Sequence, residues 1–197
     1  MVAILSGIIV PLVVKNVKDS QVARARNDVQ VIAGIIGTQY KDTGSRPIAG
    51  GIGGSTGAAN DGWFSGAAAP VIAGSLVVFP PANTFTNLFA TTAVAGTALQ
   101  QTMFGLPGTT AITAEFAYKG PYMSPADALK TDPWGTPYII LGYNTTQQTA
   151  NGPIWVASLG PDRATVAANV TAAPPATWAT TAGAAVTGMD DIVARVN

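Results

Sequence analysis

The 197-residue sequence contains no cysteine and no histidine, and these two absences exclude several kinds of site. Without cysteine, the chain cannot form a disulfide, bind a metal through thiolates or use a cysteine nucleophile. Without histidine, it lacks the usual general base, the commonest zinc ligand and the Ser-His-Asp triad. Carboxylates and lysines are present, but no group of them comes with a recognisable reaction partner. The sequence therefore predicts a protein that is not an enzyme.

Charge is also scarce, because only 10% of the residues are charged and the ten basic side chains balance the ten acidic ones. A nucleic-acid-binding protein needs a basic footprint, so no nucleic acid partner is predicted. Since 48% of the residues are hydrophobic, the composition also argues against a disordered chain. The polar surface must come from Thr, Asn, Gln, Ser and Gly, which is typical of exported or assembled proteins.

The start of the chain is a long apolar run, MVAILSGIIVPLVV, and the first charge is Lys15. This run has neither the positive region nor the cleavage site of a secretory signal. It is also shorter than the roughly 20 apolar residues that cross a bilayer. Taken alone, the run fits a buried core helix of a globular domain.

The sequence that follows, from Lys15 to about Gly44, has an amphipathic pattern instead. Its apolar residues recur at spacings of three and four and define one helical stripe, made of Val22, Ala25, Val29, Ile32, Ile36 and Tyr40. Together, residues 1–43 predict one helix of about 65 Å. A domain of this size cannot bury such a helix along its whole length, so lipid or copies of the same chain must bury its apolar first third.

Pro11 interrupts the apolar run. Proline has no N–H, so the carbonyl of Gly7 loses its helical partner, and glycine itself is a weak helix former. The sequence therefore predicts a helix that is kinked or locally unwound near Pro11.

The middle of the chain, residues 48–114, is rich in Gly, Ala and Thr and begins with the loop-like run AGGIGGSTGAANDG. A short apolar run, Ser75–Phe79, predicts a strand that stops at two prolines. Asn87–Phe104 predicts a helix, with Leu88, Ala95, Leu99 and Met103 on one face.

The most informative stretch lies nearer the C-terminus and reads GPYMSPADALKTDPWGTPYIILGY. Ser124 is placed to cap a short helix that ends at Leu129. Tyr138–Tyr143 and Pro153–Ser158 predict two strands of an antiparallel hairpin. Three large aromatic residues, Trp134, Tyr138 and Trp155, are expected to pack in the core.

The DPWG motif within this stretch predicts a tight turn. Asp132 at its first position accepts a backbone N–H, Pro133 presets φ at the second position, and Gly135 closes the turn. Trp134 is then free to pack inward.

The long helix, apolar and then amphipathic, with Pro11 in its apolar third and a KDTG end, resembles the N-terminal helix of type IV pilins and type II secretion pseudopilins. DPWGTPY, then IWVASLGPD, and DDIV near the end resemble the head domain of the type II secretion major pseudopilin. The resemblance covers residues 1–44, 120–162 and 189–193.

This resemblance implies an α+β fold in which a long N-terminal helix carries a small C-terminal antiparallel β-sheet head domain with long loops. Residues 1–44 would be the filament-core and membrane helix, and residues 45–197 the head domain. The head would comprise the Gly/Ala/Thr-rich insertion, 48–114, and a pseudopilin-like β-region, 120–197.

The resemblance also implies a function and partners. The apolar half of the helix would lie in the inner membrane, meet the pilus or secretion assembly machinery there, and then form the core of a homopolymeric helical filament. The residues expected in that core are Ile4, Leu5, Gly7, Ile8, Ile9, Pro11, Leu12 and Val13. Two forms remain open, an extracellular type IV pilus, which the long loops favour, and a periplasmic pseudopilus of a type II secretion system.

One feature departs from the family pattern. The family places a glutamate near its N-terminus to pair with a neighbouring subunit, whereas the only glutamate here is Glu115. Either residues upstream are missing from this sequence, or the subunit docks without that charge pair.

In the resembled pseudopilins a calcium ion is bound between the SLGPD-type turn and the acidic pair near the end. Carried over by position, the possible ligands here are Asp162, Asp190 and Asp191, with backbone carbonyls near Leu159. Calcium prefers six to eight oxygen ligands of this kind. The long segment between Asp162 and Asp190 leaves open the alternative that these acids are surface turn and cap residues.

A membrane-tethered adhesin is an alternative of a different class, in which the helix is only an anchor. Glycan binding would require exposed aromatic side chains. The candidates are Trp63, Phe64 and Trp178, which lie in loop-like sequence.

Overall fold

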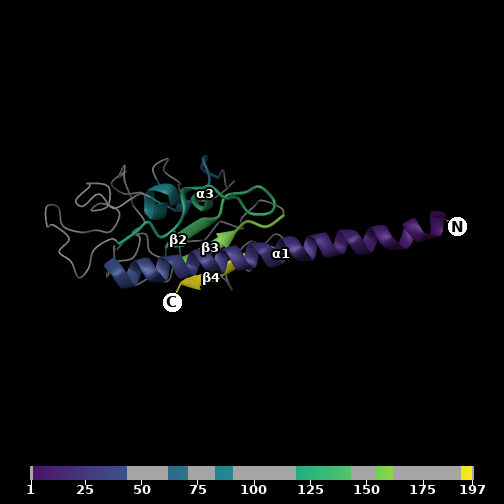
Figure 1. The fold of residues 1–197 in the computed structure, drawn as a ribbon, viewed down its shortest axis with the longest axis horizontal. Coiled ribbons are helices and arrows are strands. Elements are labelled where there is room, and N and C mark those ends of the chain that lie inside the picture. The colour runs from purple at the N-terminus through teal and green to yellow at the C-terminus, as the bar shows by residue number, and fades with distance from the viewer. Residues whose placement is uncertain are drawn as a thin grey trace, which may run out of the picture.

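The fold is α+β, with one long helix lying along a small antiparallel sheet (Figure 1). It is seen in a computed structural model that describes residues 2–43, 62–70, 83–90, 119–142, 154–161 and 192–196. Helix α1 (Val2–Thr43) carries the sheet and the short helices on its C-terminal half. Its N-terminal half extends beyond them, and the N-terminus lies far from the head domain.

Helix α1 confirms a single helix over residues 2–43 of the predicted range, but it runs through Pro11 without interruption. Of the two predicted alternatives, local unwinding is therefore wrong for this described helix, and a kink at Pro11 stays a prediction. The physical reason is that proline removes one N–H and so one hydrogen bond, while the turns on either side keep theirs. Lys41 in the last turn places a positive charge beside the negative end of the helix dipole.

The sheet has four strands in the order β1-β2-β3-β4, all antiparallel to their neighbours. Strands β2 (Ile139–Gly142) and β3 (Ile154–Ser158) confirm the predicted hairpin, with Ile140 opposite Val156. Strand β4 (Ile192–Val196) pairs with β3.

Strand β1 (Trp63–Phe64) lies where the sequence predicted a loop. It pairs with β2, with Trp63 opposite Ile140 and Phe64 opposite Ile139. Two residues are too few to show a period of two, so the sequence carried no pattern that identifies this strand.

Two short helices complete the described head. Helix α3 (Pro125–Ala128) has the predicted cap, because Ser124 Oγ accepts a hydrogen bond from the Asp127 N–H at 3.1 Å. Within the predicted helix Asn87–Phe104, the structure describes only the single π-helical turn η1 (Thr86–Ala90), in which Leu88 is buried. The remainder of that prediction and the predicted strand Ser75–Phe79 lie outside the described residues.

The hydrophobic core lies between α1 and the sheet, where α1 packs against β3 and β4. Ala25, Val29, Ile32 and Ile36 of α1 are buried against strand residues whose side chains point to the helix. These strand residues are Ile140, Ile154, Val156, Ile192 and Val196. Burying an aliphatic side chain of this size contributes about 1.5–3 kcal/mol, so the stripe fixes the head to α1.

Candidate functional site

The candidate site is the part of α1 that the head does not cover, residues 10–18, called here the projecting segment. Its large apolar side chains are between 49% and 60% exposed, and they are Val10, Leu12, Val13, Val14 and Val17. Pro11 is exposed as well. Among the expected filament-core residues, only Pro11, Leu12 and Val13 have described side chains; those of Ile4, Leu5, Gly7, Ile8 and Ile9 lie outside the described residues.

The docked segment of α1, residues 21–42, is the part that the head covers. The predicted stripe is confirmed at its centre, where Ala25, Val29, Ile32 and Ile36 are buried. At its end the prediction is wrong, because Tyr40 is 41% exposed and Gln39 is buried in its place. Both residues follow Ile36 at helical spacing, so periodicity alone did not distinguish them.

A polar connection fixes the start of the docked segment to the sheet. The Tyr138 hydroxyl donates a hydrogen bond to Asp28 Oδ2 at 2.8 Å, and Arg24 Nε lies 3.6 Å from the same oxygen. Burial, together with the neighbouring Asp28 carboxylate, raises the pKa of Tyr138 well above its usual value. Tyr138 thus remains neutral and acts as a donor to α1.

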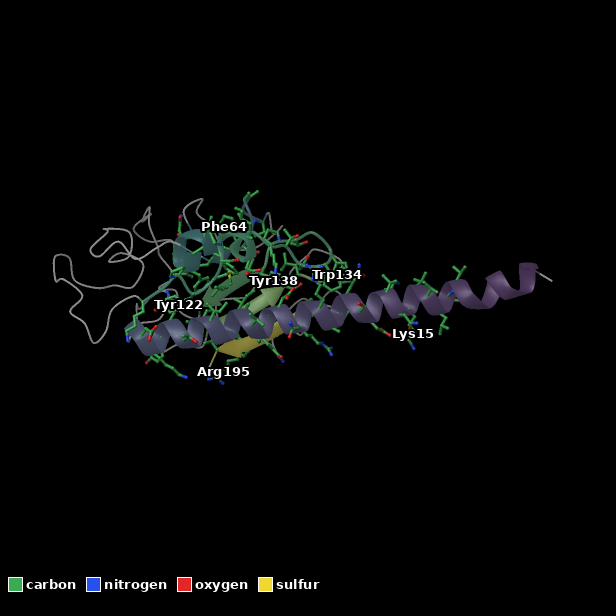
Figure 2. All side chains as sticks on the ribbon, in the orientation of Figure 1. Lys15, Phe64, Tyr122, Trp134, Tyr138 and Arg195 are labelled. Atoms are coloured by element: carbon green, nitrogen blue, oxygen red, sulfur yellow. The ribbon has the colours of Figure 1, made fainter. Side chains whose placement is uncertain are left out.

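A second polar connection fixes the end of the docked segment. The Tyr122 hydroxyl donates to Asp42 Oδ2 at 2.9 Å, and Lys119 Nζ lies 3.7 Å from Asp42 Oδ1. Burial and the Asp42 carboxylate raise the pKa of Tyr122 to about 12, against a hydrogen bond from the Lys119 N–H that lowers it. Figure 2 shows Tyr138 and Tyr122 at two separate points of the contact between the head and α1, with Lys15 further along the uncovered part.

The DPWG turn is as predicted. The Gly135 N–H donates to the Asp132 carbonyl at 3.0 Å, and Gly135 has φ +85, a conformation that favours glycine. Asp132 Oδ1 accepts from the N–H groups of Trp134 and Thr136 at 3.1 and 2.7 Å. Trp134 packs against the edge of the core.

Asp132 also connects this turn to the end of β3. Its buried carboxylate accepts a hydrogen bond from Ser158 Oγ at 2.8 Å through Oδ2. Ser158 Oγ in turn accepts a hydrogen bond from the Gly160 N–H at 3.3 Å. The two motifs that carry the family resemblance therefore meet in space at one carboxylate.

Two of the predicted core aromatics occupy different environments. Tyr138 is buried as predicted, whereas Trp155 is only half-buried and lies outside the core cluster. Ile154 and Val156 point toward α1, so strand alternation turns Trp155 to the opposite face. There the Arg195 guanidinium lies 6.0 Å from the centre of its ring.

The possible calcium ligands are mostly outside the described residues. Asp162, Asp190 and Asp191 all lie outside the described residues. Leu159 is described, and its side chain is buried. Within the described parts of the chain, no three acidic side chains come close enough together to hold a metal ion.

The candidate aromatics of the adhesin alternative do not form an exposed surface. Trp63 and Phe64 are 2% and 1% exposed, because both pack inside the head as strand β1. This corrects the expectation that they are accessible to a glycan. Trp178 lies outside the described residues.

Some residues of the site carried no sequence signal. Asp28 lies 110 positions from Tyr138 and Asp42 lies 80 positions from Tyr122, and only the fold brings each aspartate to its tyrosine hydroxyl. Ser65 likewise bridges distant segments, since its Oγ donates to the Lys130 carbonyl and accepts from the Tyr138 N–H.

Comparisons with protein-family models, with curated proteins and with solved structures found no match for this chain. Within the described residues, no helix combines the length and the apolar character needed to cross a membrane.

Proposed function

We propose that this chain is the structural subunit of a helical extracellular filament of the type IV pilus kind, assembled through the projecting segment of α1. The observation that carries the proposal is the row of five half-exposed apolar side chains on a helix that extends away from its own head. Exposed apolar surface of this kind marks an interaction site. Because each side chain is already about half-buried, a neighbour that buries the rest contributes about half of the roughly 1.5–3 kcal/mol of a fully buried side chain.

The partners follow from this mechanism. The main partner is a second copy of the chain, and assembly proceeds by packing of helices rather than by turnover of a substrate. Before assembly, the apolar start of α1 is held in the inner membrane, where the assembly machinery collects the subunits. The heads then form the outer surface of the filament.

A pseudopilus of a type II secretion system is the second candidate, and one observation favours it. The DPWG turn and the end of β3, which together resemble the major pseudopilin head, are joined through Asp132 and Ser158. Immunogold labelling distinguishes the two forms, because a pilus is labelled on the cell surface and a pseudopilus only within the periplasm.

Calcium binding belongs to this second candidate. Asp162, Asp190 and Asp191 supply carboxylates suited to calcium. Titration of calcium into the purified protein, followed by calorimetry, tests this point, and a triple replacement of these aspartates by alanine is the control.

Electron microscopy of the assembled protein tests the filament proposal. Wild type is expected to form fibres with a helical power spectrum, and deletion of Met1–Val14 is expected to leave a soluble monomer. In the intact chain, Leu12→Asp with Val17→Asp is expected to abolish fibres. Leu129→Asp is the matched control, because Leu129 is a half-exposed leucine that lies on the head. Fibres formed by the deletion variant would contradict the proposal.

A further inference from the structure

The charge of helix α1 changes abruptly where the apolar run ends. The run Met1–Val14 contains no charged side chain, whereas residues 15–26 contain four basic side chains and a single acidic one. The basic residues are Lys15, Lys18, Arg24 and Arg26, and the acidic residue is Asp19. Since the whole chain has a net charge of zero, this excess of positive charge is a local feature of α1.

The two lysines nearest the apolar run lie in the projecting segment. Lys15 and Lys18 are exposed, and neither forms an ion pair within the described residues. Their spacing of three residues makes them neighbours on the surface of the helix. Figure 2 shows Lys15 on the part of α1 that extends beyond the head. Two adjacent cations therefore lie directly beside the exposed apolar side chains of the projecting segment.

A polar interval separates the apolar run from the head. Residues 10–20 are all exposed, and among the described side chains of α1 the first that packs against the core of the head is Val22. Between Val14 and Val22, every side chain except Val17 is polar or charged. This interval, residues 15–21, is about 10 Å long at about 1.5 Å per residue.

The length and composition of this interval fit the headgroup layer of a bilayer. A bilayer is about 40–45 Å thick with its headgroups and about 30 Å thick without them, so each headgroup layer is about 5–8 Å deep. Lys15 and Lys18 lie about 2 and 6 Å beyond Val14 along the helix. If the apolar run ends at the hydrocarbon boundary, both lysines therefore lie at the level of the phosphate groups. The head then begins just outside this layer and stays in water.

Lysine is well suited to this position. Its four-carbon stem packs along apolar surface while its ammonium group reaches water or a phosphate. Anionic lipids attract lysines near their surface, and the attraction falls off within a Debye length of about 8 Å at physiological ionic strength. Arg26 lies eight residues beyond Lys18, a distance of about 12 Å. The attraction therefore depends mainly on Lys15 and Lys18.

We propose that the subunit binds anionic phospholipid through Lys15 and Lys18, whose ammonium groups contact the headgroup phosphates and fix the depth of α1 in the bilayer. This inference rests on one stage of the proposed function, the subunit held in the membrane before assembly, and adds its lipid class and its depth. Anionic lipid is favoured because the phosphate of a zwitterionic headgroup is already balanced by the cation of that same headgroup.

Vesicle flotation tests the lipid class. Full-length protein is mixed with vesicles of phosphatidylcholine alone, or of phosphatidylcholine with phosphatidylglycerol, and the bound fraction is measured. Wild type is expected to bind the anionic vesicles roughly ten- to thirtyfold more tightly, because two lysines act near the surface. Lys15→Gln with Lys18→Gln is expected to remove most of this preference and to leave binding to the neutral vesicles unchanged.

Arg26→Gln is the matched control, because it removes an exposed cation of the same helix that lies beyond the headgroup layer. It is expected to change the preference by less than about twofold. Lys18→Gln alone is expected to lower the preference by about fivefold. Circular dichroism confirms that each variant keeps its helix. An effect of Arg26→Gln as large as that of Lys18→Gln would overturn the assigned depth.

Spin labels measure the depth separately, because the natural chain has no cysteine and a single label can be placed at will. With the protein on anionic vesicles, a nitroxide on Leu12→Cys is expected to respond more to oxygen, which concentrates in hydrocarbon. A nitroxide on Ser20→Cys is expected to respond more to a water-soluble nickel complex. Both positions are exposed, so neither label disturbs the core. The reverse result at either position would contradict the assigned depth.

The outcomes separate this inference from the filament proposal. If wild type forms fibres but binds neither kind of vesicle, or binds both equally, the lipid inference is wrong and the filament function stands. The same holds if the double lysine variant keeps the preference. If wild type prefers anionic vesicles as expected but forms no fibres, the filament function is wrong, and the two lysines still define a lipid-binding segment.

Discussion

The two segments of α1 have similar apolar side chains in opposite surroundings. In the docked segment, Val29, Ile32 and Ile36 are buried against the sheet, whereas in the projecting segment Val10 and Val13 are more than half exposed. Both segments belong to one uninterrupted helix. The difference therefore comes from what lies opposite each segment, and the apolar pattern alone does not say whether its partner belongs to the same chain.

The polar residues differ in the same way. In the docked segment, Asp28 and Asp42 each accept a hydrogen bond from a tyrosine of the head. In and beside the projecting segment, Lys15, Lys18 and Asp19 have no ion pair within the described residues. These two aspartates are thus satisfied within the subunit, whereas the projecting segment retains unused apolar and charged groups.

Truncation of one side chain in each segment should have opposite effects, and this is the largest difference we expect. Ile36→Ala should lower the free energy of unfolding by about 2–5 kcal/mol, because it leaves a cavity in the core. Val13→Ala should change it by less than about 0.5 kcal/mol, as at other exposed positions, but should weaken assembly. Urea unfolding and a sedimentation assay measure the two effects. Equal losses of stability would remove the distinction between the segments.

Removal of the tyrosine hydroxyls should have a smaller effect, confined to the docked segment. Tyr138→Phe should lower the free energy of unfolding by about 1.5–3 kcal/mol, because a hydrogen bond to a charged group is lost. Tyr122→Phe should cost less, because Tyr122 is only half-buried whereas Tyr138 is buried, so water more readily replaces the lost hydrogen bond. Chemical denaturation of both variants measures the order. A larger loss for Tyr122→Phe would contradict it.

Alkaline pH should produce the smallest and most gradual effect. The pKa of Tyr122 is raised to about 12 from its ordinary value of 10, so the folded state holds this proton more tightly than the unfolded state. Its contribution to stability is complete below pH 10 and is lost as the pH rises from 10 to about 12. Ultraviolet titration of tyrosinate, with Tyr122→Phe as the control, measures the shift. Titration of Tyr122 near pH 10 would show that neither its burial nor its bond to Asp42 persists in solution.

The sequence predicted those parts of the fold that depend on local patterns. Regular spacing predicted α1 and the centre of its buried stripe, and turn chemistry predicted the Ser124 cap and the DPWG turn. It failed where the pattern was short or ambiguous. Two-residue strand β1 had no period to detect, and Tyr40 and Gln39 were equally compatible with the stripe.

The candidate site was predicted in part. The uncovered apolar segment followed from helix length, because a helix of about 65 Å exceeds what a small domain can bury. The tyrosine–aspartate connections did not follow, since each joins residues at least 80 positions apart. The position of Trp155 also depended on which face of the sheet α1 covers.

By itself, the sequence determined the secondary structure of the helix and the turns, because these depend on backbone preferences and on spacing within a few residues. It also determined that α1 carries more apolar surface than one small head can cover. Only the tertiary structure decided at which residue the head stops covering α1. It also decided which aspartates accept hydrogen bonds from the tyrosine hydroxyls, and which side of the sheet each aromatic residue occupies. These depend on contacts between distant segments, and such contacts form only when the chain packs into one fold.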